Sequence, residues 1–393
     1  MPAIARIEEL AGEFAQIRRY FHQYPELSNQ EFKTAEKIAA YLKEWGIEVH
    51  TGIGGTGVVG VLKNGTGKKR IGIRADMDAL PVQEANHFAH ASKNAGVMHA
   101  CGHDGHITGL LLTARYLAET KNFDGTVVFI FQPGEEGEFG AQHMFNDGLF
   151  ERFPVDFYLG CHNWPETPAM KVGIGKTMMS GYSGFEIKVE GRGSHGAMPN
   201  LSHDPVFAAV QIYQAAQGII TRMKRPADTA VMSICKVEAG NTFNVVPDTA
   251  TLSGTARTFD DGVTDFIEAK LRDICTNIGA AFETKATLNF FRNCSPTVNS
   301  DDGVEVVKEA VRELYGEGGL HDQEPVMPSE DFSEFLKRAP GAFFFVGAGD
   351  GSHRAEGHGD GPCLLHNSSY DYNDECLPIV ASVFARVTEN FLR

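Results

Sequence analysis

The sequence lacks several features that mark membrane or secreted proteins. Its longest apolar runs, such as residues 127–131 and 342–346, are far too short to span a bilayer. The first ten residues are amphipathic and contain no apolar core of a signal peptide. The seven cysteines are odd in number and form no Cys-x-x-Cys pair, which fits reduced thiols better than a disulfide framework. We therefore expect a cytoplasmic protein.

Positive charge is also scarce. The chain has 35 Lys and Arg against 51 Asp and Glu, a formal net charge of -16. This excess of negative charge argues against nucleic acid and anionic membrane as partners. An anionic substrate would need positive charge placed locally.

Two widespread catalytic motifs are missing as well. No Gly-x-Ser-x-Gly elbow is present, which argues against a serine hydrolase. Gly52-x-Gly54-x-x-Gly57 superficially matches a dinucleotide fingerprint, but it leads into a predicted strand and not into the required helix. A Rossmann dehydrogenase is therefore rejected.

The 393 residues, 42% hydrophobic and 22% charged, suit a globular protein of two domains. Strands predicted at 57–62, 70–75, 126–131 and 156–161 alternate with helices, which indicates an α/β fold with a mixed, mainly parallel sheet flanked by helices. Ser28 and Glu31 predict a capping box for a helix ending near Trp45. Asn64-Gly65 predicts a hairpin turn into the strand at 70–75.

The order of elements changes at residue 181. Residues 181–291 predict a β-α-β-β-α-β sequence, the split arrangement of a ferredoxin-like α+β domain. The first pattern resumes afterwards. We therefore predict that residues 1–180 and 292–393 form one metal-binding catalytic domain, with 181–291 inserted in it.

The stretch Met98–His106 concentrates possible metal ligands. Its nine residues contain three histidines, a cysteine and an aspartate, separated by small residues and followed by a helix predicted over 108–117. A tight loop of this kind suits a borderline cation such as zinc. An isolated Cys-x-His would more often be a buried thiol among surface histidines.

Several predicted strand ends of the same domain supply further ligands. Asp76 and Asp78 follow one strand and His162 follows another. Glu135 and Glu136 come shortly after a third strand. Open α/β sheets bind ligands at the carboxyl ends of their strands, so these side chains should converge. Together with a later loop they provide five donors for two divalent cations, with one donor shared: Cys101, His103, Glu136, His162 and His366.

Roles within the cluster follow from geometry. Adjacent side chains of an extended segment point to opposite faces, so Glu136 as ligand would leave the role of general base to Glu135. Asp78 is placed to orient a histidine ligand. Taken alone, Glu135-Glu136 is equally well a solvated acidic loop. The donor set suits zinc or manganese best, and also cobalt or nickel.

A cysteine nucleophile is a rival interpretation. Cys101 could act with His103 or His106 as its base. That mechanism would assign no role to the glutamate pair, to His162 or to His366.

Eight stretches match a known family and cover nearly the whole chain in order: Arg74-Ala-Asp-Met-Asp-Ala-Leu-Pro81, His99-Ala-Cys-Gly-His-Asp-Gly-His106, Gln132-Pro-Gly-Glu-Glu-Gly137, Cys161-His162, Gly193-Ser-His-Gly-Ala-Met-Pro199, Asn241 to Pro247, Ser329-Glu-Asp-Phe332 and Leu365-His-Asn367. On these stretches the chain resembles the M20 metallopeptidase superfamily, in particular its amidohydrolase branch of hippurate hydrolases, N-acyl-amino-acid amidohydrolases and plant auxin-conjugate hydrolases. Cys101 replaces the bridging aspartate of many superfamily members, which indicates this branch.

The resemblance implies a zinc-exopeptidase-like catalytic domain with a dinuclear site on the five donors and Glu135 as general base. It further implies that the inserted domain is a lid that dimerises, giving a homodimer or a dimer of dimers. In such a dimer His195 would reach the partner's site and stabilise the oxyanion. By itself, a lone loop histidine is more often solvent-facing.

Asn244 and Arg257 are candidates to bind the substrate carboxylate, the arginine through a bidentate fork. An ordinary cross-strand ion pair is the alternative for Arg257. The expected activity is hydrolysis of small N-acyl or N-aroyl amino acids. The alternatives are a metal-dependent carboxypeptidase or dipeptidase acting on short peptides, and a non-catalytic metal- or peptide-binding protein.

Overall fold

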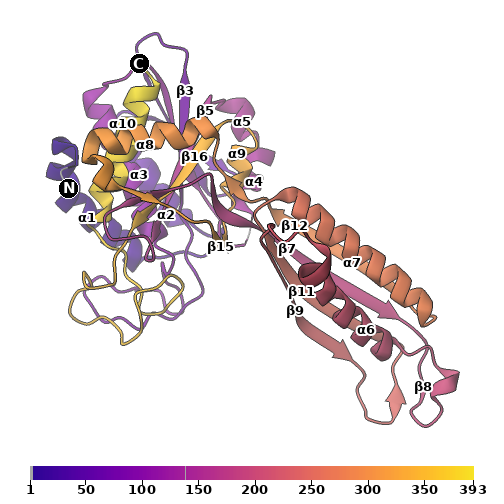
Figure 1. Ribbon diagram of the computed structural model, residues 1–393. Coiled ribbons are helices and arrows are strands. Elements are labelled where there is room, and N and C mark those ends of the chain that lie inside the picture. The colour runs from indigo at the N-terminus through magenta and orange to yellow at the C-terminus, as the bar shows by residue number, and fades with distance from the viewer. Residues whose placement is uncertain (1–2, 138) are drawn as a thin grey trace. The chain divides into compact units, whose positions relative to one another are not determined.

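A computed structural model describes residues 3–137 and 139–393 of the chain (Figure 1). The chain folds into two compact units. Unit 1 comprises Met1–Met178, Val298–Glu324 and Asp331–Arg393, and unit 2 comprises Met179–Thr297 and Pro325–Glu330. Within the described ranges, no helix has both the length and the apolar character needed to cross a membrane.

Unit 1 is built on an eight-stranded mixed sheet in the order β1-β2-β4-β3-β5-β16-β6-β14. The central neighbours β4, β3, β5 and β16 run parallel, whereas β1, β2 and β4 pair antiparallel. The strands are β1 Glu48–Ile53, β2 Gly57–Asn64, β3 Arg70–Asp76, β4 Gly125–Gln132, β5 Phe157–Trp164, β6 Val172–Ile174, β14 Leu320–Asp322 and β16 Gly341–Gly347.

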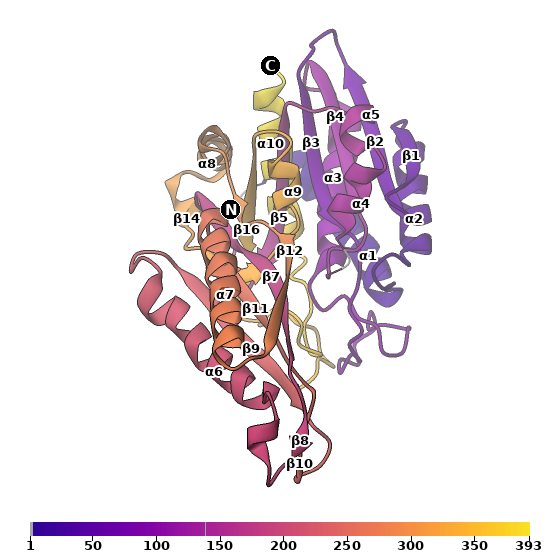
Figure 2. The ribbon, with the colours of Figure 1, turned by 90° about the vertical axis from the view of Figure 1, so that its right-hand side faces the viewer.

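Two groups of helices contact this sheet, as Figure 2 shows. One group contains α2, α3, α8 and α10, which contact its strands, with α1 against α3 and α10. The other contains α4 and α9, which contact its strands, with α5 against α4. Their bounds are α1 Ala5–Gln23, α2 Phe32–Glu44, α3 His103–Thr120, α4 Gly140–Asn146, α5 Leu149–Arg152, α8 Asp301–Tyr315, α9 Ser333–Leu336 and α10 Cys376–Phe391. The predicted α/β fold is confirmed.

The core explains this arrangement. All eight residues of β4 are buried, as expected for a continuous apolar run that is covered on both faces of a sheet. Helix α3 lies so close to α10 that a Cβ added at Gly109 would lie only 2.8 Å from Val380 Cγ1. A small residue is therefore required at this helix crossing.

Unit 2 contains the antiparallel sheet β12-β7-β11-β9 with two helices. Numbered in chain order, these four strands stand across the sheet as 4-1-3-2, the topology of the predicted ferredoxin-like arrangement. The residues of β7 alternate between the core and the other face from Ser183 onward. The bounds are β7 Thr177–Glu190, α6 Pro205–Gly218, β9 Ala230–Ala239, β11 Thr249–Thr258, α7 Asp261–Ala281 and β12 Lys285–Cys294.

Short elements complete the chain. They are β8 Ser194–His195, β10 Val245–Val246, β13 Thr297–Val298 and β15 Val326–Ser329, the 3-10 turns Pro199–Leu201 and Glu317–Gly319, and a π-helical turn at Ile219–Met223 that continues α6.

The capping box predicted for Ser28 and Glu31 is wrong. Helix α2 begins at Phe32, and its first-turn N–H groups at Lys33 and Thr34 donate to the Glu26 carboxylate and not to Ser28 or Glu31. The Ser28 hydroxyl instead donates to Asp78 at 2.7 Å, and Glu31 accepts from the Thr56 hydroxyl at 2.6 Å. Both polar side chains therefore bond to residues outside the helix and not to its first turn.

The predicted hairpin at Asn64-Gly65 is also wrong, because β4 lies between β2 and β3 and pairs with both. The chain does turn at Gly65, which has a positive φ. The backbone N–H groups of Thr66 and Gly67 then donate to Asp124 at 2.7 Å each. Local turn propensity marks a reversal of the chain, but burial of the apolar β4 decides which strands pair.

Candidate metal centre

The His-Cys-His stretch lies at the amino end of α3. The helix begins at His103, preceded by Gly102 with φ 89°. This start is five residues earlier than the sequence predicted, so His103 and His106 both lie in the first turn. Side chains three residues apart share one face of a helix. The helix thus aims both imidazoles toward the ends of the neighbouring strands.

A first donor group consists of Cys101, His103 and His162, whose ligand atoms lie within 4.8 Å of one another. All three residues are buried. His162 is contributed by β5, and its Nε2 lies 3.4 Å from the Cys101 thiol sulfur. The helix start and one strand end therefore meet as predicted.

A second donor group consists of Cys101, Glu136 and His366, again within 4.8 Å. His366 Nε2 lies 3.3 Å from Glu136 Oε1, and the His366 side chain is 56% exposed. Its backbone has a positive φ of 65°, and its N–H donates to the carbonyl of Ala100 at 2.7 Å. Both groups include Cys101, so the thiol is the donor that two cations would share.

The glutamate pair differs from the expectation in one respect. Glu135 and Glu136 do not lie in an extended segment but in a turn between Gly134 and Gly137, both with positive φ. Side chains in a turn do not alternate between faces, and oxygens of both carboxylates come within 4.8 Å of His103. Glu136 also belongs to the group with Cys101, whereas Glu135 does not.

Hydrogen bonds orient both buried histidines of the first group. His103 Nδ1 lies 3.1 Å from Asp78, and His162 Nδ1 lies 2.6 Å from the carbonyl of Asn163. An Nδ1–H that donates to an oxygen leaves the Nε2 lone pair available to a metal. Asp78 also accepts from the backbone N–H of Glu136 at 3.0 Å.

Unsatisfied polar atoms show that the donors fit a metal. His103 Nε2 is buried and has no hydrogen-bond partner among the described residues. Glu136 Oε1 also lacks a hydrogen bond among them, although it lies 3.3 Å from His366 Nε2. Such atoms are rare in folded proteins and call for an explanation, for which a bound ion is one of the usual answers. The thiol, imidazoles and carboxylate are the ligand types that zinc and similar divalent ions take.

Electrostatics support the same fit. Burial and the nearby Glu136 raise the pKa of the Cys101 thiol well above its usual value, and burial lowers the pKa of His162 well below its usual value. Although burial opposes it, the carboxylates of Asp76 and Asp78 raise the pKa of His103 to about 10. A positive charge at this position is favoured, and a cation would supply it while stabilising the thiolate.

A third buried group, Asp76, His103 and His106, has the spacing of a metal site but a different environment. Arg74 donates to Asp76 at 2.8 Å and is itself buried. A guanidinium next to the carboxylate repels a cation. We therefore do not count this group as a metal site.

Comparisons with known proteins decide the family. The profile of peptidase family M20/M25/M40 matches residues 72–390. The chain belongs to this family. Over 395 residues it is 41% identical to the hippurate hydrolase of Campylobacter jejuni, with all of both chains covered. It is 37% identical to the IAA-amino acid hydrolase ILR1-like 2 of Arabidopsis thaliana, covering 99% of this chain and 87% of the relative.

A solved structure is similar over the same length. The YXEP protein of Bacillus subtilis, a dinuclear metal-binding peptidase of the M20 family, superposes with a TM-score of 0.83. It is 30% identical in sequence and covers 98% of this chain and 99% of its own. The M20 chain described here is a hydrolase of amide bonds.

In unit 2 the structure brings His195 and Asn244 close together. Val245 pairs with His195 between β10 and β8, and the Gly196 N–H donates to the Asn244 carbonyl at 2.8 Å. The exposed His195 ring accepts the Ala197 N–H at Nδ1, at 3.0 Å. A neutral imidazole that accepts at Nδ1 carries its proton at Nε2, so His195 presents a donor to solvent.

Arg257 lies at the other end of β11 from the segment that carries Asn244. Its guanidinium stacks on Tyr182, 3.9 Å from the ring centroid, and donates to Thr255 and to the Ala256 carbonyl. Among the described residues, the titratable neighbours that act on its charge are Tyr182 and Cys294, and none is a carboxylate. The cross-strand ion pair considered from the sequence is therefore absent from this part of the chain.

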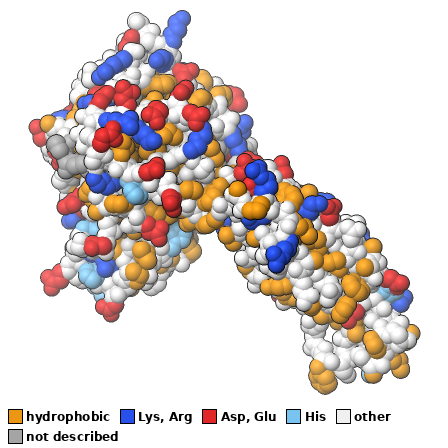
Figure 3. All heavy atoms as spheres, in the orientation of Figure 1, with side chains coloured by type: hydrophobic (Ala, Val, Ile, Leu, Met, Phe, Trp, Pro, Cys, Tyr) orange, Lys and Arg blue, Asp and Glu red, His pale blue; other side chains and the backbone are white. Residues whose placement is uncertain are grey.

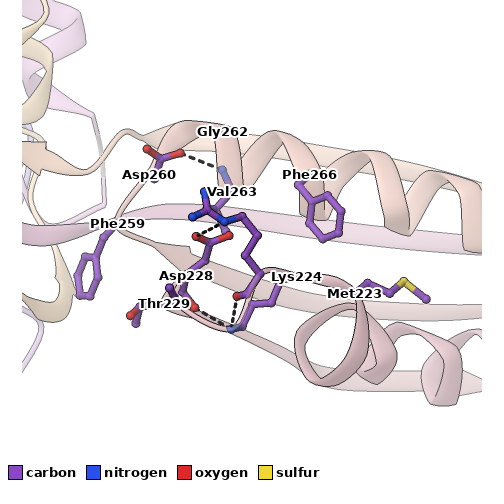
Figure 4. A pocket seen from close by; sticks show the side chains of 11 residues that line it. Met223, Lys224, Asp228, Thr229, Phe259, Asp260, Gly262, Val263 and Phe266 are labelled. Carbon is purple, nitrogen blue, oxygen red and sulfur yellow. Dashed lines mark hydrogen bonds and ion pairs between the residues drawn. The ribbon is translucent and has the colours of Figure 1, made fainter.

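Unit 2 also has a cavity of about 530 Å³ between the π-helical turn and α7, which Figure 4 shows. Its charged groups are engaged locally. Lys224 donates to the carbonyls of Arg225 and Asp228, and Asp260 caps α7 by accepting from Val263. The cavity belongs to unit 2, whereas all five candidate metal donors belong to unit 1.

Supporting residues near the donors were missed from the sequence. Ser28, which donates to Asp78, was interpreted as a helix cap. Gln132 donates to Asp331 at 2.9 Å, and Asp331 also accepts the N–H of Ala141 at the start of α4. These bonds fix both sides of the glutamate turn. The sequence motifs Gln132-Pro and Ser329-Glu-Asp-Phe332 contain these residues, but the sequence does not show that Gln132 and Asp331 bond to each other.

Proposed function

We propose that the chain hydrolyses the amide of N-acyl and N-aroyl amino acids of the hippurate type, releasing a carboxylic acid and an amino acid. The observation that carries the proposal is the pair of donor groups that share Cys101, with the Glu135 carboxylate beside them. The similarity to a hippurate hydrolase and to a hydrolase of IAA-amino acids supports this substrate class.

Cys101, His103 and His162 would hold one divalent ion, and Cys101, Glu136 and His366 would hold the other, with zinc or manganese the best match to the donors. Bound at these positions, the two ions would polarise the amide carbonyl and acidify the attacking water. Asp78 holds the His103 ring in place through Nδ1.

Glu135 moves the proton. As general base it accepts a proton from the attacking water while the water oxygen bonds to the carbonyl carbon. The same carboxyl group then returns the proton to the nitrogen of the substrate as the C–N bond breaks. Water is consumed, and the two products carry its oxygen and its two hydrogens.

Unit 2 would act as a lid and dimerisation domain, with limits at 181–291. The Nε2–H of His195 from the partner subunit would donate to the developing oxyanion. Asn244 or Arg257 would bind the substrate carboxylate. The apolar surface of unit 2 supports an interface: Phe207, Val210 and Tyr213 on α6 are between 40% and 51% exposed, and Figure 3 shows hydrophobic side chains over this unit.

The decisive experiment compares Glu135→Gln with the wild type on hippurate, acetyl-amino acids and short dipeptides, with elemental analysis of each protein. Glutamine keeps the size of the side chain but cannot accept a proton. We expect kcat to fall by about 10²- to 10⁴-fold with the metal content unchanged. Glu151→Gln, at an exposed position of α5, serves as a matched control.

Wild-type rates in the Glu135→Gln variant would refute the assignment of the base. Faster turnover of dipeptides than of acyl-amino acids would favour the peptidase alternative, which the name of the similar YXEP structure also supports. Metal and ligand binding without any product would indicate a binding protein.

A further inference from the structure

A chain of buried polar side chains lies beneath the metal donors and begins at the end of β3. Asp76 Oδ1 lies 2.6 Å from His106 Nδ1, and the other oxygen accepts from Arg74 at 2.8 Å. Asp76 and His106 are 0% and 2% exposed. Neither residue takes part in the proposed reaction. Burying such groups is costly unless they are fully paired, so their presence here calls for another role.

The chain continues from His106 to Asn163. His106 Nε2 lies 3.1 Å from the backbone nitrogen of Asn163 and 2.6 Å from its side-chain oxygen. A ring nitrogen either accepts or donates, so it bonds Asn163 through the backbone N–H or through the oxygen of the side-chain amide. That amide in turn donates to the hydroxyl of Tyr370. Asn163 is thus held in three directions at a site where it is 1% exposed.

Asn163 controls the position of one metal donor. Its carbonyl accepts the Nδ1–H of His162 at 2.6 Å, which leaves Nε2 of that ring 3.4 Å from the Cys101 sulfur. Its side chain also packs under the turn between two other donors. A Cβ added at Gly102 would lie 2.5 Å from the Asn163 side-chain oxygen, so the Asn163 amide and the Gly102 backbone are in close contact.

Two of the three donors of the second group, Glu136 and His366, are held by other contacts. Glu136 is fixed by its backbone N–H, which donates to Asp78 at 3.0 Å. His366 is fixed by its backbone N–H, which donates to Ala100 at 2.7 Å. A change in the position of Asn163 should therefore weaken metal binding at the first group more than at the second.

We propose that His106 is a positioning residue for one half of the metal centre. It holds Asn163, and Asn163 sets the orientation of His162, so the contact between His106 and Asn163 supports metal binding at Cys101, His103 and His162 but not at Cys101, Glu136 and His366. The inference rests on the proposed function, because it takes these five residues as metal ligands.

Two substitutions separate the two bonds of His106. Asparagine places its amide near the position of Nδ1 and keeps the bond to Asp76, whereas glutamine reaches the position of Nε2 and keeps the bond to Asn163. Each is made in a His366→Ala background, which leaves only the first group, and in a His162→Ala background, which leaves only the second. Affinity for zinc is measured by competition with a chelator, and the absorption spectrum of the cobalt-loaded protein is recorded.

In the His366→Ala background we expect His106→Asn to weaken zinc binding by about 10- to 100-fold, the range found when partners of metal ligands are removed, and to shift the cobalt spectrum. His106→Gln should recover most of the affinity. In the His162→Ala background His106→Asn should change the affinity less than about threefold, because a residue that acts through His162 has no effect in its absence.

His90→Asn controls for general destabilisation, since His90 is buried and pairs with Asp371 at 3.1 Å in the same unit. It should lower the melting temperature and leave zinc affinity in both backgrounds unchanged. Equal losses in both backgrounds for His106→Asn, or equal behaviour of His106→Asn and His106→Gln, would overturn the proposal.

The outcome is separable from that of the proposed function. A wild-type protein that binds two metal ions but cleaves no acyl-amino acid would refute the activity, and the affinities above would still decide the role of His106. A wild-type protein that binds no divalent metal would overturn both.

Discussion

At the scale of single residues, Cys101 has the most demanding position. It is buried and belongs to both donor groups, and its surroundings raise the pKa of the thiol. The thiolate is therefore unfavourable unless cations compensate its charge. Because both groups include this thiol, replacing it with the neutral hydroxyl of serine should weaken both.

Replacing Cys101 with Ser should accordingly lower metal binding at both groups. We expect fewer than two equivalents of zinc after gel filtration, whereas His366→Ala should lose only one. Elemental analysis of the purified proteins tests this, with Cys235→Ser at an exposed position of unit 2 as control. A Cys101→Ser protein that keeps two equivalents would show that the thiol is not the shared donor.

The meeting of these side chains in unit 1 could be predicted from the sequence, because polar residues after buried strands meet at one edge of a sheet. Their supports could not. The bond from Ser28 to Asp78 joins residues 50 positions apart, and the same serine followed by a glutamate three positions later is typical of a helix cap. Only tertiary structure distinguishes these two uses of one side chain.

At the scale of elements, α1 is attached to the start of α3 by buried charges. Arg18 donates to Asp104 at 3.2 Å and to Asp371 at 2.9 Å, and His22 lies 2.9 Å from Asp104 and 3.1 Å from Glu84. Although burial opposes it, these carboxylates raise the pKa of His22 to about 10. The protonated His22 therefore contributes to the stability of unit 1.

This contribution should decrease as pH rises. Below the ordinary pKa of about 6.5, His22 is protonated in both the folded and the unfolded chain, and its bonds to Asp104 and Glu84 stabilise the fold fully. Between about 6.5 and 10 the unfolded chain loses the proton first, which costs about 1.4 kcal/mol of stability for each pH unit. The difference in unfolding free energy between the wild type and His22→Gln should shrink over this range.

Urea unfolding at several pH values measures that difference, and the subtraction removes the titration of groups common to both proteins. A difference that stays constant or grows from pH 6.5 to 9.5 would show that His22 is neutral in the folded protein. The existence of α1 could be predicted from its apolar period, but its buried charges could not, because their partners lie more than 60 residues away in sequence.

At the scale of the whole molecule, the five candidate metal donors lie in unit 1 and His195 lies in unit 2. The proposed dimer would combine the donors of one subunit with His195 of the other. The alternation of elements in the sequence predicted both folds, since hydrophobic periods persist over whole strands and helices. Strand order could not be predicted in the same way, as the insertion of β4 between β2 and β3 shows.

Subunit mixing tests the exchange of His195 between subunits. Glu135→Gln and His195→Ala should each be nearly inactive, but a mixed dimer contains one site with Glu135 and a partner with His195. Co-refolded in equal amounts, the two variants should recover about a quarter of the wild-type activity, as random pairing in a twofold dimer requires. Activity that stays at the level of the separate variants would contradict action across the dimer.

The central claim is that five side chains of unit 1 hold two divalent ions around one shared thiolate. Anomalous X-ray diffraction from crystals loaded with zinc tests it most directly. The account predicts two peaks, one among Cys101, His103 and His162 and the other among Cys101, Glu136 and His366. A single peak, or metal bound away from the Cys101 sulfur, would contradict it.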